Sequence, residues 1–324
     1  MNSASERHLR DPRALTCLTQ LVKPSIIEVG EERKGIPDAL LNNCSCHDAL
    51  DYTRACASSR RSSTSSTPEQ VHGEGGGPAL ADSTTVTAND ARPLAQAVTA
   101  PSEEFGCAID FEDPPYYSKY DLVDDTAPQW RAAHPNAKGV TVISGDTFQT
   151  QFLRTSDTGT SPAEAERVLD NVVSDYNASA NPGRFTVRNE GDGRFAIVGT
   201  YVKDKNGQDQ TISPILDTPI SIQVETRDAN TTIEIILNAL TVKSQTKVAP
   251  FMVPLNALAQ SQVTVGGQNI PARVLLLQTL SATKMKLYWR LYYDNDVKMY
   301  GFRLLPLMKA NYDVSGNRTT VLLR

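Results

Sequence analysis

The sequence predicts an α+β fold made of two tandem small units, each with two helices packed against small β-sheets and a C-terminal β-hairpin. The recurrence of one order of elements predicts it. A strand, a helix, a second strand, a second helix and an aromatic hairpin follow one another between about residues 84 and 208, and the same order returns between about residues 209 and 308. Neither stretch contains a catalytic motif, which points toward a binding or assembly role. A repeated supersecondary unit of this kind is typical of similar domains in tandem.

The first unit is expected to span residues 81–208. Its second helix has the clearest start, because Ser161 can cap it, Pro162 suits its first position and Glu164 can complete a capping box. Its first helix contains Pro101, which should break or bend it. In chain order the expected elements are a strand at 84–87, a helix at 90–106, a strand at 140–143, a helix at 161–176 and a hairpin at 185–202.

The second unit is expected to span residues 209–310. Its first helix should start after an Asn230 cap and bury a stripe that includes Leu237. Its second helix is apolar around most of its circumference, Leu276 included, so it should be well buried. The expected elements are a strand at 220–224, a helix at 231–245, a strand at 262–265, a helix at 271–283 and a hairpin at 287–305.

Residues 1–80 are expected to be a disordered tail, or a wrongly assigned one, because they are rich in Ser and Gly and lack apolar periodicity. Residues 311–324 are expected to be a C-terminal extension. Four of the five cysteines lie in the tail, at Cys17, Cys44, Cys46 and Cys56, and the fifth is Cys107. The tail cysteines lack the spacing of common zinc sites, so we expect neither a metal nor a cofactor.

The charge and hydropathy of the chain exclude some functions. The net charge of −5 shows no broad basic balance suited to nucleic acid. No apolar run is long enough for a transmembrane helix, so no direct membrane span is expected. No signal peptide is visible in the chain as given.

Segments of the second unit match a known pattern of strands, helices and an aromatic hairpin. They are Ile220-Ser221-Ile222, Asp228-Ala229-Asn230-Thr231-Thr232, Val263-Thr264-Val265, Asn269-Ile270-Pro271-Ala272 and Leu287-Tyr288-Trp289. In these segments the second unit resembles the secretin and TonB N-terminal short domain (STN domain). The first unit resembles it more loosely, through residues 90–94 and 109–114.

This resemblance implies a periplasmic role at the cell envelope, associated with the outer membrane. Domains of this family contact partner proteins, here secretin or TonB-system-like components, and have no catalytic residues to carry over. The chain departs from the family pattern because no signal peptide is visible and no barrel or secretin segment follows residue 324. We therefore expect a free-standing adaptor, or a relative that has lost its membrane part.

The most suggestive group of carboxylates is Asp110, Glu112 and Asp113. General acid–base chemistry needs two carboxylates in differing environments, which such a cluster could supply in a cleft between the units. The simpler interpretation is a solvated strand end and a rigid turn. An enzyme using this cluster is therefore the alternative function.

The last hairpin carries the candidate partner-binding surface, at Tyr288, Arg290 and Tyr292. An unpaired hairpin edge is available for strand addition by a partner, and Tyr and Arg often anchor interfaces. Two other interpretations are a stacking platform for single-stranded nucleic acid and packing of this face against the first unit. The leading hypothesis is a non-enzymatic protein–protein interaction module of the cell envelope.

Overall fold

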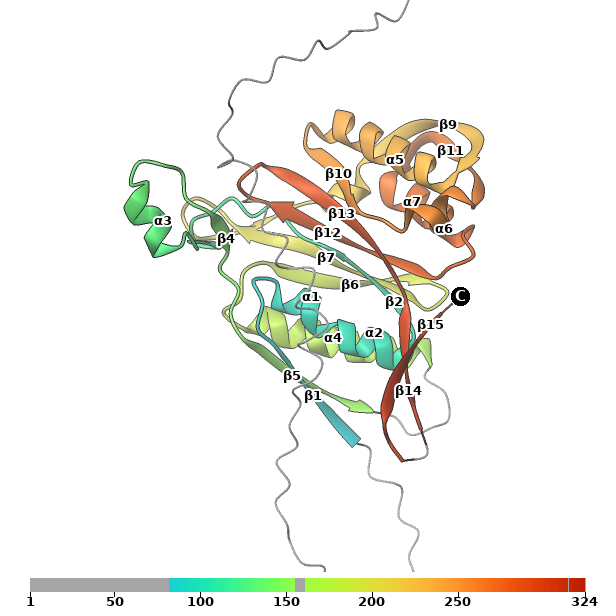
Figure 1. The fold of residues 1–324 in the computed structure, drawn as a ribbon, viewed down its shortest axis with the longest axis horizontal. Coiled ribbons are helices and arrows are strands. Elements are labelled where there is room, and N and C mark those ends of the chain that lie inside the picture. The colour runs from blue at the N-terminus through green and yellow to red at the C-terminus, as the bar shows by residue number, and fades with distance from the viewer. Residues whose placement is uncertain (1–81, 155–160, 314, 324) are drawn as a thin grey trace, which may run out of the picture. The chain divides into compact units, whose positions relative to one another are not determined.

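A mixed β-sheet carries the fold of the residues that the structure describes, which are residues 82–154, 161–313 and 315–323 of a computed structural model (Figure 1). The predicted tail at 1–80 lies outside them. Across the sheet the strands are β10 (Lys247–Met252), β13 (Met299–Pro306), β12 (Leu287–Asp294), β2 (Ala108–Glu112), β7 (Arg194–Lys203) and β6 (Arg184–Gly191), and β8 (Asp209–Thr211) pairs with the end of β7. β10 and β6 are therefore the outer strands of this order.

The first half, residues 82–203, supplies β2, β7 and β6 to the sheet. β2 runs parallel to β7, and β6 runs antiparallel to β7. A separate antiparallel ribbon consists of β1 (Asp82–Ala88) and β5 (Phe148–Arg154). Helices α1 (Pro93–Ala97), α2 (Thr99–Phe105) and α4 (Pro162–Ala178) lie between this ribbon and the sheet (Figure 1).

The second half, residues 219–306, repeats these pairings. β10 runs parallel to β13, and β12 runs antiparallel to β13. The ribbon consists of β9 (Pro219–Asp228) and β11 (Gln262–Pro271), which are antiparallel. Its helices are α5 (Ala229–Ser244), α6 (Leu255–Ala259) and α7 (Ala272–Ser281). A short 3₁₀ helix, η4 (Ile215–Asp217), precedes this half.

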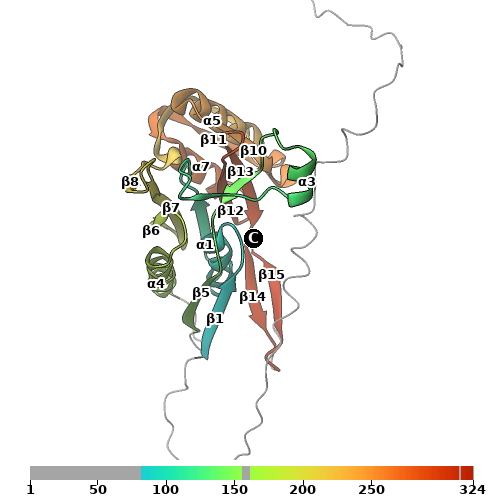
Figure 2. The ribbon, with the colours of Figure 1, turned by 90° about the vertical axis from the view of Figure 1, so that its left-hand side faces the viewer.

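The two halves meet where β12 pairs with β2, Arg290 beside Phe111 and Leu291 beside Glu112. β12 runs parallel to β2, whereas β6, its counterpart in the first half, runs antiparallel to β2. Because the order of the strands is the same in both halves, the second half must be turned over about an axis across the strands. The helices of the two halves therefore cover opposite faces of the sheet, as Figures 1 and 2 show.

The predicted α+β class is confirmed, but the strands that were expected to form separate small sheets are joined. Each half has its own apolar core. One includes Leu169 of α4 and Phe195 of β7, and the other includes Leu237 of α5 and Leu276 of α7. The sheet therefore separates two cores, each closed by a ribbon and helices.

Local signals placed several elements correctly. The Ser161 hydroxyl accepts a hydrogen bond from the Glu164 N–H at 3.2 Å, as the capping box predicts. The helix expected at 90–106 is broken at Val98 into α1 and α2, and Pro101 is the third residue of α2, where the N–H that proline lacks has no helical acceptor. The cap of α5 is Asp228 instead of Asn230, and its Oδ1 accepts the Thr231 N–H at 2.9 Å.

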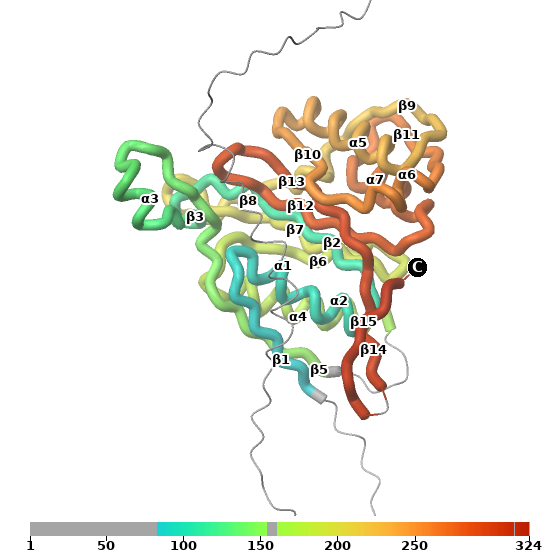
Figure 3. Tube along the Cα trace, in the orientation of Figure 1, coloured from blue at the N-terminus to red at the C-terminus, as the bar shows by residue number. Residues whose placement is uncertain are grey.

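The strand expected at residues 140–143 has a different role. It is β4 (Thr141–Ile143), which pairs with β3 (Leu122–Asp124) in an insertion at residues 114–147 that also carries α3 (Pro128–Ala133). The partner of β1 is β5. β2 was not among the expected elements, although apolar and polar residues alternate from Ile109 to Glu112, and every residue in it is buried. The tube in Figure 3 follows this insertion in green.

The expected C-terminal extension is part of a hairpin. β14 (Met308–Tyr312) pairs antiparallel with β15 (Arg318–Leu322), so the hairpin begins before residue 311. It lies beside α2, where Tyr312 donates a hydrogen bond to Glu104 at 2.8 Å. The chain after β13 thus returns to the first half.

The core of the second half can be tested at Leu237 and Leu276, whose exposed fractions are 1% and 0%. Leu→Ala at either position should lower the free energy of unfolding by about 2–5 kcal/mol, because it leaves a cavity between α5 and α7. Urea denaturation measures the loss. Val242→Ala is the control, since Val242 is 80% exposed on α5. Unchanged midpoints for both leucine variants would contradict this core.

Candidate functional site

The three carboxylates singled out in the sequence lie at the junction of the two halves. Asp110 in β2 is fully buried. Its side chain accepts hydrogen bonds from Arg194 Nη1 at 2.8 and 2.9 Å and from the Trp289 N–H at 2.8 Å. Arg194 also donates to the Leu287 carbonyl. One carboxylate of the first half therefore binds the backbone of the strand with which β2 pairs.

Glu112 and Asp113 make the same kind of connection. Glu112 is paired with Arg273 of α7 and accepts the Leu216 N–H at 3.1 Å. Asp113 accepts Arg92 Nε at 2.5 Å and the Tyr293 N–H at 3.1 Å. Arg92 Nη2 in turn donates to the Tyr293 carbonyl at 2.8 Å.

These contacts form a carboxylate lock, defined as Asp110, Glu112 and Asp113 with their arginines Arg194, Arg273 and Arg92. Each carboxylate lies in the first half and accepts a backbone N–H from a later segment, which is β12 for Asp110 and Asp113 and η4 for Glu112. Burying an ionised carboxylate is costly unless it is both paired and hydrogen-bonded, and here each is. The lock therefore specifies how the two halves meet.

Burial dominates the electrostatics of the lock. It raises the pKa of Asp110, Glu112 and Asp113, and the facing arginine opposes that rise in each case. Burial acts to lower the pKa of Arg273, but Glu112 and Asp217 outweigh it, so the pKa is raised. The arginines thus offset the cost of placing three charges inside the protein.

The placement of these carboxylates bears on the enzyme alternative. They were expected in a solvated turn or an open cleft, but at most 2% of any of the three residues is exposed. A substrate has no access to them in this arrangement. Arg92, Arg194 and Arg273 were not predicted, and no local motif marks them, because each lies far along the chain from the carboxylate that it binds.

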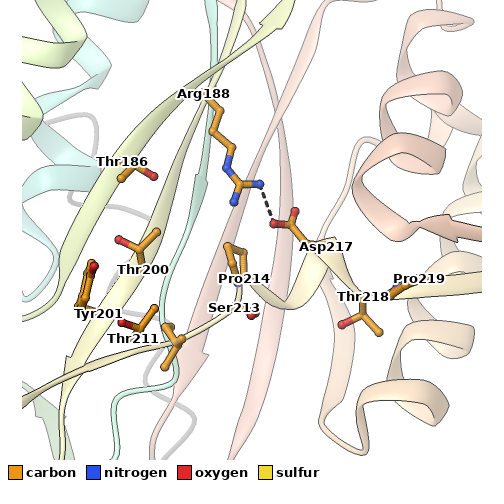
Figure 4. A pocket seen from close by; sticks show the side chains of 11 residues that line it. Thr186, Arg188, Thr200, Tyr201, Thr211, Ser213, Pro214, Asp217, Thr218 and Pro219 are labelled. Atoms are coloured by element: carbon orange, nitrogen blue, oxygen red, sulfur yellow. Dashed lines mark hydrogen bonds and ion pairs between the residues drawn. The ribbon is translucent and has the colours of Figure 1, made fainter.

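A groove of about 680 Å³ is lined by residues of β6, β7, β8 and η4 and by the chain around η4 (Figure 4). Arg188 reaches from β6 to Asp217 of η4, with Nη1 and Oδ2 2.6 Å apart. Asp217 also accepts Arg273 Nε at 2.9 Å, so the groove connects to Glu112 through Arg273. Its lining is rich in hydroxyl groups, at Thr186, Thr200, Tyr201, Thr211, Ser213 and Thr218.

The predicted surface residues Tyr288, Arg290 and Tyr292 lie on the opposite face of the sheet, on β12. The expectation of an unpaired edge there is wrong, because β12 lies between β13 and β2. Arg290 is buried, and the ring of Tyr292 packs edge-on against that of Phe111, with 6.1 Å between the ring centres. Part of this face thus packs against the first half, which the sequence offered as an alternative.

The rest of this face holds an arginine–aromatic ladder, defined as Arg92, Tyr292, Arg303 and Phe251. The guanidinium carbon of Arg92 lies 4.7 Å from the centre of the Tyr292 ring. The guanidinium carbon of Arg303 lies 5.4 Å from the same ring centre and 5.0 Å from that of Phe251. Phe251 is 69% exposed on the outer strand β10. The ladder therefore runs from Asp113 in the lock to an exposed aromatic ring.

Comparison with known protein families, curated proteins and solved structures finds no match for this chain. Within the described ranges, no group of three or more His, Cys, Asp and Glu side chains is arranged to hold a metal ion. No helix in that part of the chain is both long and apolar enough to cross a membrane.

The lock makes a quantitative prediction. Arg273→Met should lower the free energy of unfolding by about 3–5 kcal/mol, because it leaves the buried Glu112 without its cation. Adding Glu112→Gln should recover part of the loss, since the unpaired charge is then gone. Chemical denaturation of both variants measures the effect.

The control for this prediction is Arg131→Met. Arg131 pairs with Asp124, and the two side chains are 35% and 57% exposed, so water screens this pair. The midpoint for this variant should stay close to that of the unchanged protein. If Arg131→Met and Arg273→Met lower the free energy of unfolding equally, burial of the ion pair does not explain the contribution of Arg273 to stability.

Proposed function

We propose that this protein is a non-enzymatic interaction module of the cell envelope, made of two STN-like units fused through one sheet. The units are residues 81–208 and 209–310. In this proposal the protein is periplasmic and contacts secretin or TonB-system-like components. It uses the face of β12 and β13 that carries Tyr288, Arg290 and Tyr292.

The recurrence of the strand pairings supports the tandem units. In both halves a ribbon is formed by the first strand of the half and a later one, and an inner strand runs parallel to the second strand of the hairpin. A chance arrangement of strands has no reason to repeat all of these pairings in the same order. The STN-like segments at 220–222 and 263–265 fall on β9 and β11.

The arginine and backbone contacts of the three carboxylates support a binding role over an enzymatic one. Asp110, Glu112 and Asp113 are all committed to the junction, whereas general acid–base groups must reach the proton that they transfer. The arginine–aromatic ladder is built from residue types that anchor protein interfaces and ends at the exposed Phe251. This surface is the observation that carries the proposal.

Photo-crosslinking in the source organism tests this function. A benzophenone amino acid in place of Phe251 should give a discrete adduct with an envelope protein of the secretin or TonB class. The control replaces Val224, which is 61% exposed on β9 and is not part of the ladder. The same adducts from both positions, or adducts with cytoplasmic proteins alone, would contradict the proposal.

A further inference from the structure

Arg290 is a buried cation without a counter-ion among the residues that the structure describes. Its exposed fraction is 3%, and it forms no ion pair or hydrogen bond with any residue in the described part of the chain. Its guanidinium lies 5.2 Å from the ring centre of Tyr288 and 5.8 Å from that of Phe111. Aromatic rings offset part of the desolvation of a cation but leave its N–H donors unsatisfied, and Nη1 is buried in this condition.

A second cation lies directly opposite. Arg303 of β13 is the registered neighbour of Arg290 across the antiparallel pair. Arg303 is half-buried against Tyr292 and Phe251, and it has no carboxylate partner among the described residues. Like charges opposite each other on neighbouring strands destabilise a sheet. The free protein therefore holds an electrostatic cost at this pair.

The arginines of the lock provide the contrast. Arg92, Arg194 and Arg273 all have carboxylates at hydrogen-bonding distance. Within the described ranges, the arginines at the junction of the halves are thus neutralised, and Arg290 and Arg303 on the neighbouring strands are not. A bound carboxylate would remove the cost at Arg290 and Arg303, and charge-assisted hydrogen bonds are among the stronger ones.

We propose that this face binds an acidic polypeptide segment. Its carboxylate pairs with Arg303 and lowers the repulsion at Arg290, while an apolar side chain packs on the exposed ring of Phe251. This inference rests on the proposed function, for which it names the chemistry of the partner. A nucleic acid fits less well, because such binding needs several phosphate contacts and the chain carries a net charge of −5.

Fluorescence anisotropy with a labelled peptide tests the chemistry. The probe is Gly-Glu-Phe-Glu-Phe-Glu-Gly, and its matched control has Gln in place of each Glu. The glutamate peptide should bind the unchanged protein, and Arg303→Gln should weaken that binding at least about tenfold. Lys284→Gln removes the same charge from an exposed loop and should leave the affinity unchanged. Equal binding of both peptides, equal affinity of Arg303→Gln, or tighter binding of an oligothymidylate would overturn the inference.

Arg290→Met supplies a second readout that a purely structural arginine would not give. Methionine keeps much of the apolar contact with Tyr288 and Phe111 but removes the uncompensated charge. The melting temperature should stay equal or rise, while the affinity for the glutamate peptide falls at least about threefold. A melting temperature several degrees lower would identify the guanidinium as a structural group and overturn this assignment.

The outcomes separate this inference from the proposed function. Crosslinking at Phe251 without binding of the glutamate peptide would retain the interaction role and reject an acidic partner. Binding of the peptide without an envelope adduct would retain the chemistry of the face and reject the cellular role.

Discussion

The parallel pairing of β2 with β12 is the contact on which the rest of the structure depends. It joins two three-stranded arrangements into one sheet and reverses the second relative to the first. A short parallel pairing by itself is a weak constraint, because only a few backbone hydrogen bonds define its register. The carboxylate lock supplies what the backbone lacks, since its side chains accept hydrogen bonds from Trp289, Leu216 and Tyr293.

The reversal has a consequence for both surfaces of the sheet. Each half has helices on one face only, so each leaves its other face without helices of its own. On the first half this face forms the floor of the groove at Arg188, and on the second half it carries the arginine–aromatic ladder. Both surfaces connect to the lock, the groove through Asp217 and Arg273 and the ladder through Arg92.

The two sets of arginines show different uses of the same side chain. In the lock, a guanidinium offsets the cost of a buried carboxylate, and the pair holds a unique arrangement of strands. On β12 and β13, Arg290 and Arg303 contact aromatic rings and lie opposite each other in register, with no carboxylate partner in the described part of the chain. A protein selected for stability alone would replace such residues, so their cost is the physical reason to assign them a binding role.

The sequence by itself determined the features that short-range physics controls. The capping box at Ser161, the alternation along Phe185–Val202 and the apolar stripe with Leu237 each act within a few residues, so the helices and hairpins were placed well. The shared face of Tyr288, Arg290 and Tyr292 also follows from the period of a strand.

Only the tertiary structure decided which strands are edges and which charges are buried. Glu112 and Arg273 are 161 positions apart, and Asp113 and Tyr293 are 180 apart, so no local pattern could pair them. The acidic residues of β2 look like a solvated turn in sequence, because carboxylates are seldom buried without a partner. Their partners come from distant segments, and folding alone brings those segments together.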